Sequence, residues 1–139
     1  MIEILPHSFE IKNEEKIILW IEKCIYSINE NAEIDCIEYN FCSDDELLKI
    51  NLEHLSHDTL TDIISFDNSI GEEILSGEIF ISIERVKENA QIFNVSFEQE
   101  LKRVMIHGVL HFLGQKDKTE AQQAQMTQKE EYCLSLWEE

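Results

Sequence analysis

Hydrophobic positions along this chain alternate between a two-residue spacing and a helical spacing. The two-residue spacing and short apolar runs predict strands over residues 2–11, 33–41, 62–66 and 78–83. Apolar residues three and four positions apart predict helices over residues 13–29, 43–55, 84–93, 97–113 and 119–137. Gly71 and Gly77 lie between the last two strands, as is typical of a β-hairpin connection.

This order of elements, β-α-β-α-β-β-α-α-α, predicts an α+β (mixed α/β) fold. We expect one small mixed sheet of about four strands, packed by about five helices. Pro6 cannot donate a ladder hydrogen bond, so the first strand should lie at an edge of the sheet. No repeat or linker interrupts the pattern, and we expect residues 1–139 to form one domain.

Three of the predicted helices begin at a hydroxyl side chain that is followed, three residues later, by Glu or Gln. These pairs are Ser43 with Glu46, Ser96 with Gln99, and Thr119 with Gln122. Such a pair satisfies backbone groups at the first turn of a helix. We therefore expect a capped helix start at each of the three positions.

The segment HGVLHFLGQKD, at residues 107–117, is the strongest indication of chemistry. His107 and His111 are four residues apart on a predicted helix, so they share one face and can hold one metal ion together. Gly114 can adopt the left-handed conformation that ends a helix, and the returning chain could bring Asp117 to the same ion. Three protein ligands and an open fourth position are typical of a catalytic zinc site, here on a zincin-like helix.

Each of these residues also has a simpler interpretation. His107 and His111 could be partly buried histidines that are satisfied by neighbouring groups, and Asp117 could cap the last helix together with Glu120. The histidine helix is otherwise nearly all apolar, however, and burying two unpartnered imidazoles would cost several kcal/mol. A shared metal ion removes that cost, so we favour the metal site.

The usual zincin motif, HExxH, places a glutamate general base next to the first histidine. Gly108 occupies that position here, which argues against a metallopeptidase. Zinc lowers the pKa of a bound water to near neutrality by itself, and a second group could position that water or the substrate. The candidates are Glu78, Asp62 and His57, although the segment around the last two, residues 57–66, also fits an ordinary polar turn.

Charge gives a mixed indication about the substrate. The net charge of −18 argues against a nucleic-acid substrate, because an acidic protein repels a phosphate backbone. Six of the eleven basic residues nevertheless fall in segments near the proposed site: Arg85, Lys87, Lys102, Arg103, Lys116 and Lys118. They form either a basic patch around the metal or scattered, solvated charges.

The remaining features predict a cytoplasmic protein. No apolar run is long enough to span a membrane, and the N-terminus does not have the pattern of a signal peptide. The four cysteines contain no C-x-x-C pair: Cys24, Cys36, Cys42 and Cys133. We expect them to be reduced residues of the core rather than zinc ligands.

Three motifs occur in order between Asn51 and Asp117: N-x-x-x-x-x-HDTxTDIISF, GEIFIS and HGVLHFLGxxD. Together they resemble the YbeY family of bacterial endoribonucleases, which are also called rRNA maturation factors. Three separated matches in order are far more specific than one.

The resemblance implies an α/β fold and a zinc-dependent endoribonuclease that selects single-stranded RNA. It implies roles in maturation of the small-subunit rRNA 3′ end and in ribosome quality control. Carried over residue by residue, the ligands of one zinc ion per chain are His107, His111 and Asp117. The implied partners are single-stranded rRNA and the small ribosomal subunit with its proteins, without a membrane or DNA.

The chain departs from the family pattern at two places. Asp117 stands where most members have a third histidine, and its extra negative charge should make the metal a weaker Lewis acid. Leu55 stands where the family tends to carry an arginine, which would suit phosphate contact. Either His57, Lys116 or Lys118 takes over that contact, or the activity is weaker. The candidate catalytic residues are therefore His57, Glu78 and Lys116.

A non-catalytic function remains an alternative on the sequence. The acidic surface suits basic ribosomal proteins, and charge complementarity would speed their encounter. In that case the chain is a ribosome-assembly factor with a structural zinc, and the missing arginine marks lost catalysis.

Overall fold

The computed structural model describes residues 1–7, 9–55, 61–71 and 73–138. Its elements are β1 (Ile2–Ile4), α1 (Glu14–Ile28), β2 (Glu33–Cys42), α2 (Asp44–Ile50), β3 (Ile63–Asp67), β4 (Ile74–Ser82), α3 (Ile83–Phe93), α4 (Phe97–Phe112) and α5 (Glu120–Ser135). A π-helical turn at Asn51–Leu55 continues α2. The predicted α+β class and the predicted order of elements are confirmed.

The strands form one mixed sheet in the order β1-β2-β4-β3. β1 pairs with β2 and β2 pairs with β4 in parallel, whereas β3 and β4 form the expected antiparallel hairpin. β1 lies at the edge, as predicted, but it ends at Ile4 and does not extend to residue 11. The Leu5 amide still donates to the Tyr39 carbonyl over 3.0 Å. Pro6 has no amide proton, so the ladder stops there.

Gly77 lies inside β4 and not in the hairpin connection, because β4 begins at Ile74 rather than at residue 78. A Cβ atom at this position would come within 2.6 Å of the Phe112 ring and would clash with the Phe66 carbonyl. The missing side chain therefore lets the end of α4 approach the sheet. This close approach helps to position the site, since α4 carries both histidines.

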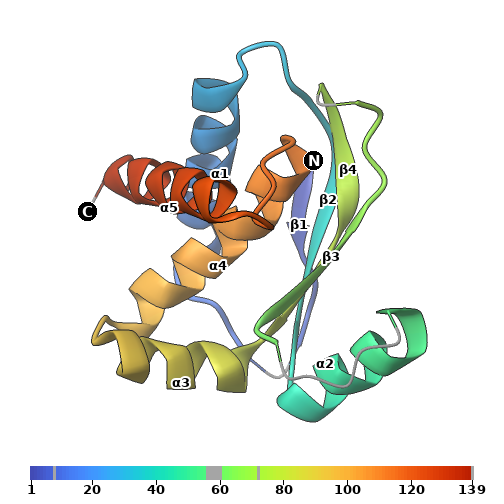
Figure 1. Cartoon of the computed structure of the whole chain (residues 1–139), viewed down its shortest axis with the longest axis vertical. Coiled ribbons are helices and arrows are strands. Elements are labelled where there is room, and N and C mark those ends of the chain that lie inside the picture. The colour runs from blue at the N-terminus through green and yellow to red at the C-terminus, as the bar shows by residue number, and fades with distance from the viewer. Residues whose placement is uncertain (8, 56–60, 72, 139) are drawn as a thin grey trace.

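Figure 1 shows the sheet nearly edge-on, with α1, α3, α4 and α5 on one side of it. α4 lies at the centre of this layer and buries nine of its sixteen residues. The Tyr39 hydroxyl of β2 is buried and donates to the Met105 carbonyl over 2.8 Å, which ties α4 to the sheet. On the other face, Leu47 of α2 packs with Ile64 and with Phe80.

The three expected helix caps are present. Ser43 with Glu46 and Thr119 with Gln122 form complete capping boxes, and the Ser96 hydroxyl accepts from the Gln99 amide. These caps depend only on residues close in sequence, so local spacing was enough to predict them.

All four cysteines are free thiols, and three of them are buried as expected. Cys36 is the exception, because it lies half-exposed on β2 next to inward-facing Ile37. Within the described residues, no helix is both long enough and apolar enough to cross a membrane.

Candidate metal centre

His107 and His111 lie one turn apart on α4, with their rings nearly perpendicular and 4.7 Å apart between centroids. Their Nε2 atoms face each other over 3.1 Å. The helix places both side chains on the one partly open strip of an otherwise buried surface. The arrangement predicted from their four-residue spacing is therefore present.

The opposite ring nitrogens are both held by neighbours. The Nδ1 atom of His111 lies 2.9 Å from the Gln115 carbonyl, which can only accept, so this nitrogen carries the proton. The Nδ1 atom of His107 lies 2.5 Å from a carboxylate oxygen of Glu130. When both Nδ1 atoms are protonated, both Nε2 lone pairs point at the same space.

The turn after α4 brings Asp117 to this space. Gly114 has a φ of 96°, its amide donates to the His111 carbonyl, and the Gln115 amide donates to the Leu110 carbonyl. This pattern is a Schellman motif, and it reverses the chain. The Asp117 Oδ2 atom then lies 3.5 Å from Nε2 of His107 and 3.4 Å from Nε2 of His111.

The competing interpretation of Asp117 as a helix cap is wrong, because Thr119 caps α5. The half-buried Asp117 carboxylate instead faces the two imidazoles. The signal that could have separated the two interpretations was the complete capping box of Thr119 with Gln122, which leaves the cap position filled.

These three side chains fit a single metal ion. Four tetrahedral ligands at 2.0–2.1 Å from zinc are separated from one another by about 3.3 Å. The three separations found here, 3.1, 3.4 and 3.5 Å, are close to that value. Burial and the neighbouring His107 lower the pKa of His111, which favours the neutral imidazole that a metal requires.

A buried ionic network supports His107 from behind. Glu130 is 5% exposed and accepts from Arg103 Nη1 over 3.3 Å as well as contacting His107. Arg103 also donates to both oxygens of Glu100, at 2.9 and 2.5 Å, and lies 3.7 Å from Asp62. The hydrogen bonds to Glu100 are the main reason that the pKa of Arg103 is raised. Arg103 thus links the start of β3 to the metal ligands.

The sequence pattern did not point to Glu130, Glu100 or Gln115 as part of the site. A usable signal existed for the first of these, because Glu130 lies on the buried stripe of α5 between Met126 and Cys133. A carboxylate on such a stripe is seldom left without a partner.

The comparisons with known proteins agree with this geometry. The sequence model of the family described as Endoribonuclease YbeY matches residues 2–138. The chain belongs to the YbeY family. A relative named Endoribonuclease YbeY from Christiangramia forsetii is 54% identical over 94% of this chain and 90% of its own length. Another of the same name, from Flavobacterium psychrophilum, is 55% identical over 94% and 91%.

The fold of this YbeY family member also matches a solved structure. The solution structure of TM1509 from Thermotoga maritima gives a TM-score of 0.69 at 27% identity, over 98% of this chain and 88% of the other. Family membership makes the chain a nuclease of the hydrolase class, so the alternative of a protein without catalysis is not supported.

A peptidase is disfavoured by the packing as well. A Cβ atom on Gly108 would lie 2.9 Å from the Ile79 side chain and 3.1 Å from that of Ile63. The position that holds the glutamate base in HExxH zincins is therefore pressed against the sheet in this chain.

The candidate catalytic residues have different locations. Lys116 and Lys118 are exposed and, with His111 and Asp117, line an open hollow of about 420 Å³. Glu78 is not at the site: it is exposed on β4, and the adjacent residue Ile79 faces α4 instead. Alternate residues of a strand point to opposite faces, so Glu78 lies on the far side of the sheet. His57 lies outside the described residues.

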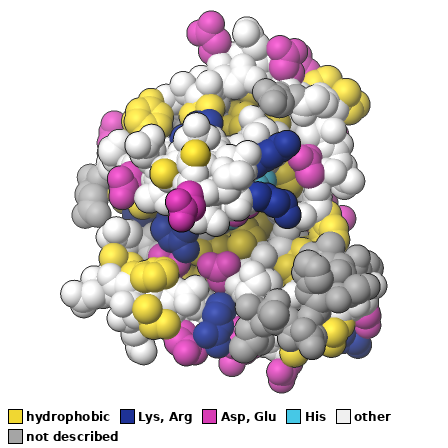
Figure 2. Space-filling view, viewed as in Figure 1, with side chains coloured by type: hydrophobic (Ala, Val, Ile, Leu, Met, Phe, Trp, Pro, Cys, Tyr) yellow, Lys and Arg dark blue, Asp and Glu magenta, His cyan; other side chains and the backbone are white. Residues whose placement is uncertain are grey.

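The six basic residues do not form one patch. Lys116 and Lys118 lie at the hollow, and Figure 2 shows basic side chains above and below a histidine on this face. Arg85 and Arg103 are engaged by carboxylates, of Asp44 in the first case and of Glu100 in the second. Lys87 and Lys102 line a different cavity.

Proposed function

We propose that this chain is a zinc-dependent endoribonuclease that cleaves single-stranded regions of rRNA. The observation that carries the proposal is the convergence of His107, His111 and Asp117, with each imidazole fixed through its Nδ1 atom. These three residues would hold one zinc ion per chain. When bound, zinc supplies Lewis-acid polarisation of a phosphoryl oxygen and a water of lowered pKa.

The residues around the three ligands have separate tasks in this proposal. Glu130 keeps the proton on Nδ1 of His107, and the Gln115 carbonyl does the same for His111, so both Nε2 atoms stay available. Lys116 and Lys118 contact the phosphate beside the scissile bond from the hollow that they line. They supply the positive charge that the family arginine would provide at position 55.

We propose further that the substrate is the 3′ region of small-subunit rRNA and that the enzyme acts in its maturation and in ribosome quality control, in the cytoplasm. The names of the relatives support RNA as the substrate class. The net charge of −18 supports docking to basic proteins of the small subunit. Residues 1–139 would act as one domain in this role.

The proposal predicts chelator-sensitive cleavage that is selective for single strands. Purified protein should cut a single-stranded RNA that carries the small-subunit 3′ region, and should cut the same sequence in a duplex much more slowly. Treatment with a chelator should stop cleavage, and added zinc should restore it, because the three ligands hold the only metal that the reaction needs. Gel analysis of labelled RNA measures both effects. Undiminished cleavage in the chelator, or equal cleavage of the duplex, would contradict the proposal.

A further inference from the structure

A second cavity lies away from the metal centre, between the segment before α1, the first half of α4 and the end of α5. Its volume is about 310 Å³, which is enough for a nucleobase with part of its sugar. Leu101 of the cavity and His111 of the metal centre are ten residues apart on α4, or roughly 15 Å along the helix. The cavity is therefore not part of the site described above.

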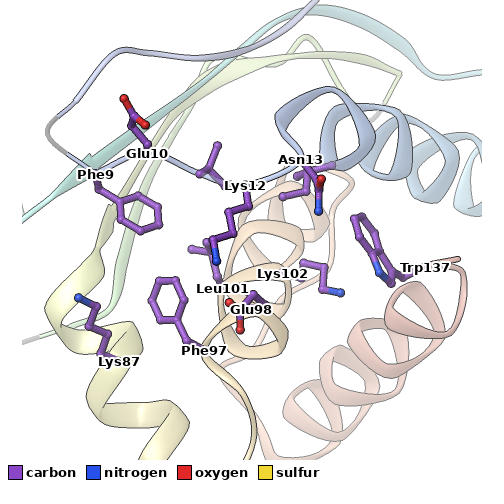
Figure 3. A pocket seen from close by; sticks show the side chains of 12 residues that line it. Phe9, Glu10, Lys12, Asn13, Lys87, Phe97, Glu98, Leu101, Lys102 and Trp137 are labelled. Atoms are coloured by element: carbon purple, nitrogen blue, oxygen red, sulfur yellow. The ribbon is translucent and has the colours of Figure 1, made fainter. Parts of the chain in front are cut away.

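Aromatic rings form much of the cavity wall. Figure 3 shows Phe9 and Phe97 on one side and Trp137 on the other. The two phenylalanine rings meet edge to face at 5.7 Å between centroids. Trp137 is half-exposed and packs its ring against that of Trp20 at 5.9 Å, which holds the indole in place. Fixed, partly exposed rings are surfaces on which a planar base can stack.

Positive charge gathers at the same place in a chain that is otherwise strongly acidic. Lys12, Lys87 and Lys102 line the cavity, each from a different segment. The ammonium groups of Lys102 and Lys16 lie 4.0 and 4.5 Å from the centroid of the Trp137 ring. These are four of only eleven basic residues in the chain.

Part of this charge has no carboxylate partner. Within the described part of the chain, Lys12, Lys16 and Lys87 make no ion pair. Glu10 and Glu98 also line the cavity, but Figure 3 shows the Glu10 carboxylate directed away from the rings and Lys12 directed toward them. Among the lining residues, three lysines against two glutamates leave a positive charge of about one, beside apolar rings.

We infer that this cavity binds one nucleotide of the RNA strand, outside the nucleotides that reach the metal centre. The base would stack on Trp137 or Phe97 in place of a lysine ammonium that lies over the ring, and the displaced lysine and Lys12 would contact the phosphate. A ligand that combines a planar ring with a negative charge matches both features, and RNA carries both in every nucleotide. An acidic peptide would use the lysines but would leave the aromatic wall without a matching group. The inference rests on RNA being the substrate of the proposed function.

Charge reversal at Lys12 tests this inference, with Lys49→Glu as the matched control, because both lysines are exposed and Lys49 lies on α2. We expect Lys12→Glu to weaken the binding of single-stranded RNA several-fold. The negative slope of log affinity against log salt concentration should become shallower by about one, because one phosphate contact is lost. Trp137→Leu should weaken binding by roughly 5- to 150-fold, the range for loss of one stacked base. KM for RNA should rise with little change in kcat.

Circular dichroism of each variant shows whether the protein is still folded, and its metal content shows whether the metal centre is intact. Weaker RNA binding by a folded variant that keeps its metal is then due to the change in the cavity. Binding by Lys12→Glu and by folded Trp137→Leu that equals binding by Lys49→Glu would overturn the inference while leaving the metal-centre proposal intact. Binding of a polyglutamate peptide that RNA does not displace would also overturn it. Wild-type protein that neither binds nor cleaves RNA would instead contradict the proposed function itself.

Discussion

Replacing His111 by alanine is expected to abolish RNA cleavage. The change removes one of three converging ligands, together with the Nδ1 hydrogen bond to the Gln115 carbonyl that shapes the turn before Asp117. The loss should exceed the roughly 10- to 100-fold effect that is typical when only a group supporting a ligand is lost. Initial rates on single-stranded RNA at saturating zinc measure this effect.

His7→Ala is the matched control, because it removes an exposed imidazole that is far from the metal centre in the fold. It should cleave RNA at the wild-type rate. Circular dichroism of the metal-free proteins shows whether α4 is still formed in His111→Ala. Wild-type cleavage by a folded His111→Ala protein would rule out the three-ligand centre as the catalytic site.

Replacing Glu130 by glutamine is expected to weaken metal binding by roughly 10- to 100-fold without unfolding the protein. The buried carboxylate accepts from Nδ1 of His107 and so fixes the tautomer and the ring orientation in which Nε2 faces the metal. Glutamine keeps an acceptor of similar size but loses the charge. Arg103 keeps its two bonds to Glu100, so the network is not left with an unpaired cation. Zinc titration against a competing chelator measures the affinity.

Glu131→Gln provides the control for this change. Glu131 is the next residue of α5, is exposed, and loses the same charge when it is replaced. Its variant should bind zinc as the wild type does. Equal zinc affinity in Glu130→Gln and Glu131→Gln would show that the contact with His107 does not support the metal.

The sequence was sufficient to predict those features that depend on contacts between residues close together in the chain. The four-residue spacing of His107 and His111, the glycine that ends α4 and the capping boxes all involve residues within one or two turns of each other. The hairpin of β3 and β4 followed from two apolar runs that are close in the chain. The regular geometry of helices and strands alone fixes how such residues lie relative to one another, so their positions could be predicted.

The predictions were wrong or incomplete where a contact between segments far apart in the chain determines the position of a residue. Gly77 has the composition of a turn, yet it serves the approach of Phe112, which is 35 residues later in the chain. Glu78 is close to a site motif in sequence, but the pleat of β4 turns it to the opposite face. Glu130 reaches His107 only because α4 and α5 pack together. No local pattern contains that information.

The zinc content of the purified chain, measured by elemental analysis, tests directly whether His107, His111 and Asp117 hold a metal ion together. We compare wild type with His107→Ala, His111→Ala and Asp117→Ala, each loaded with zinc and then freed of excess metal. We expect about one zinc per wild-type chain, because a single three-ligand site holds one ion, and sharply less in all three variants. A wild-type chain that holds no metal after loading, or variants that retain it fully, would show that His107, His111 and Asp117 do not form a metal site.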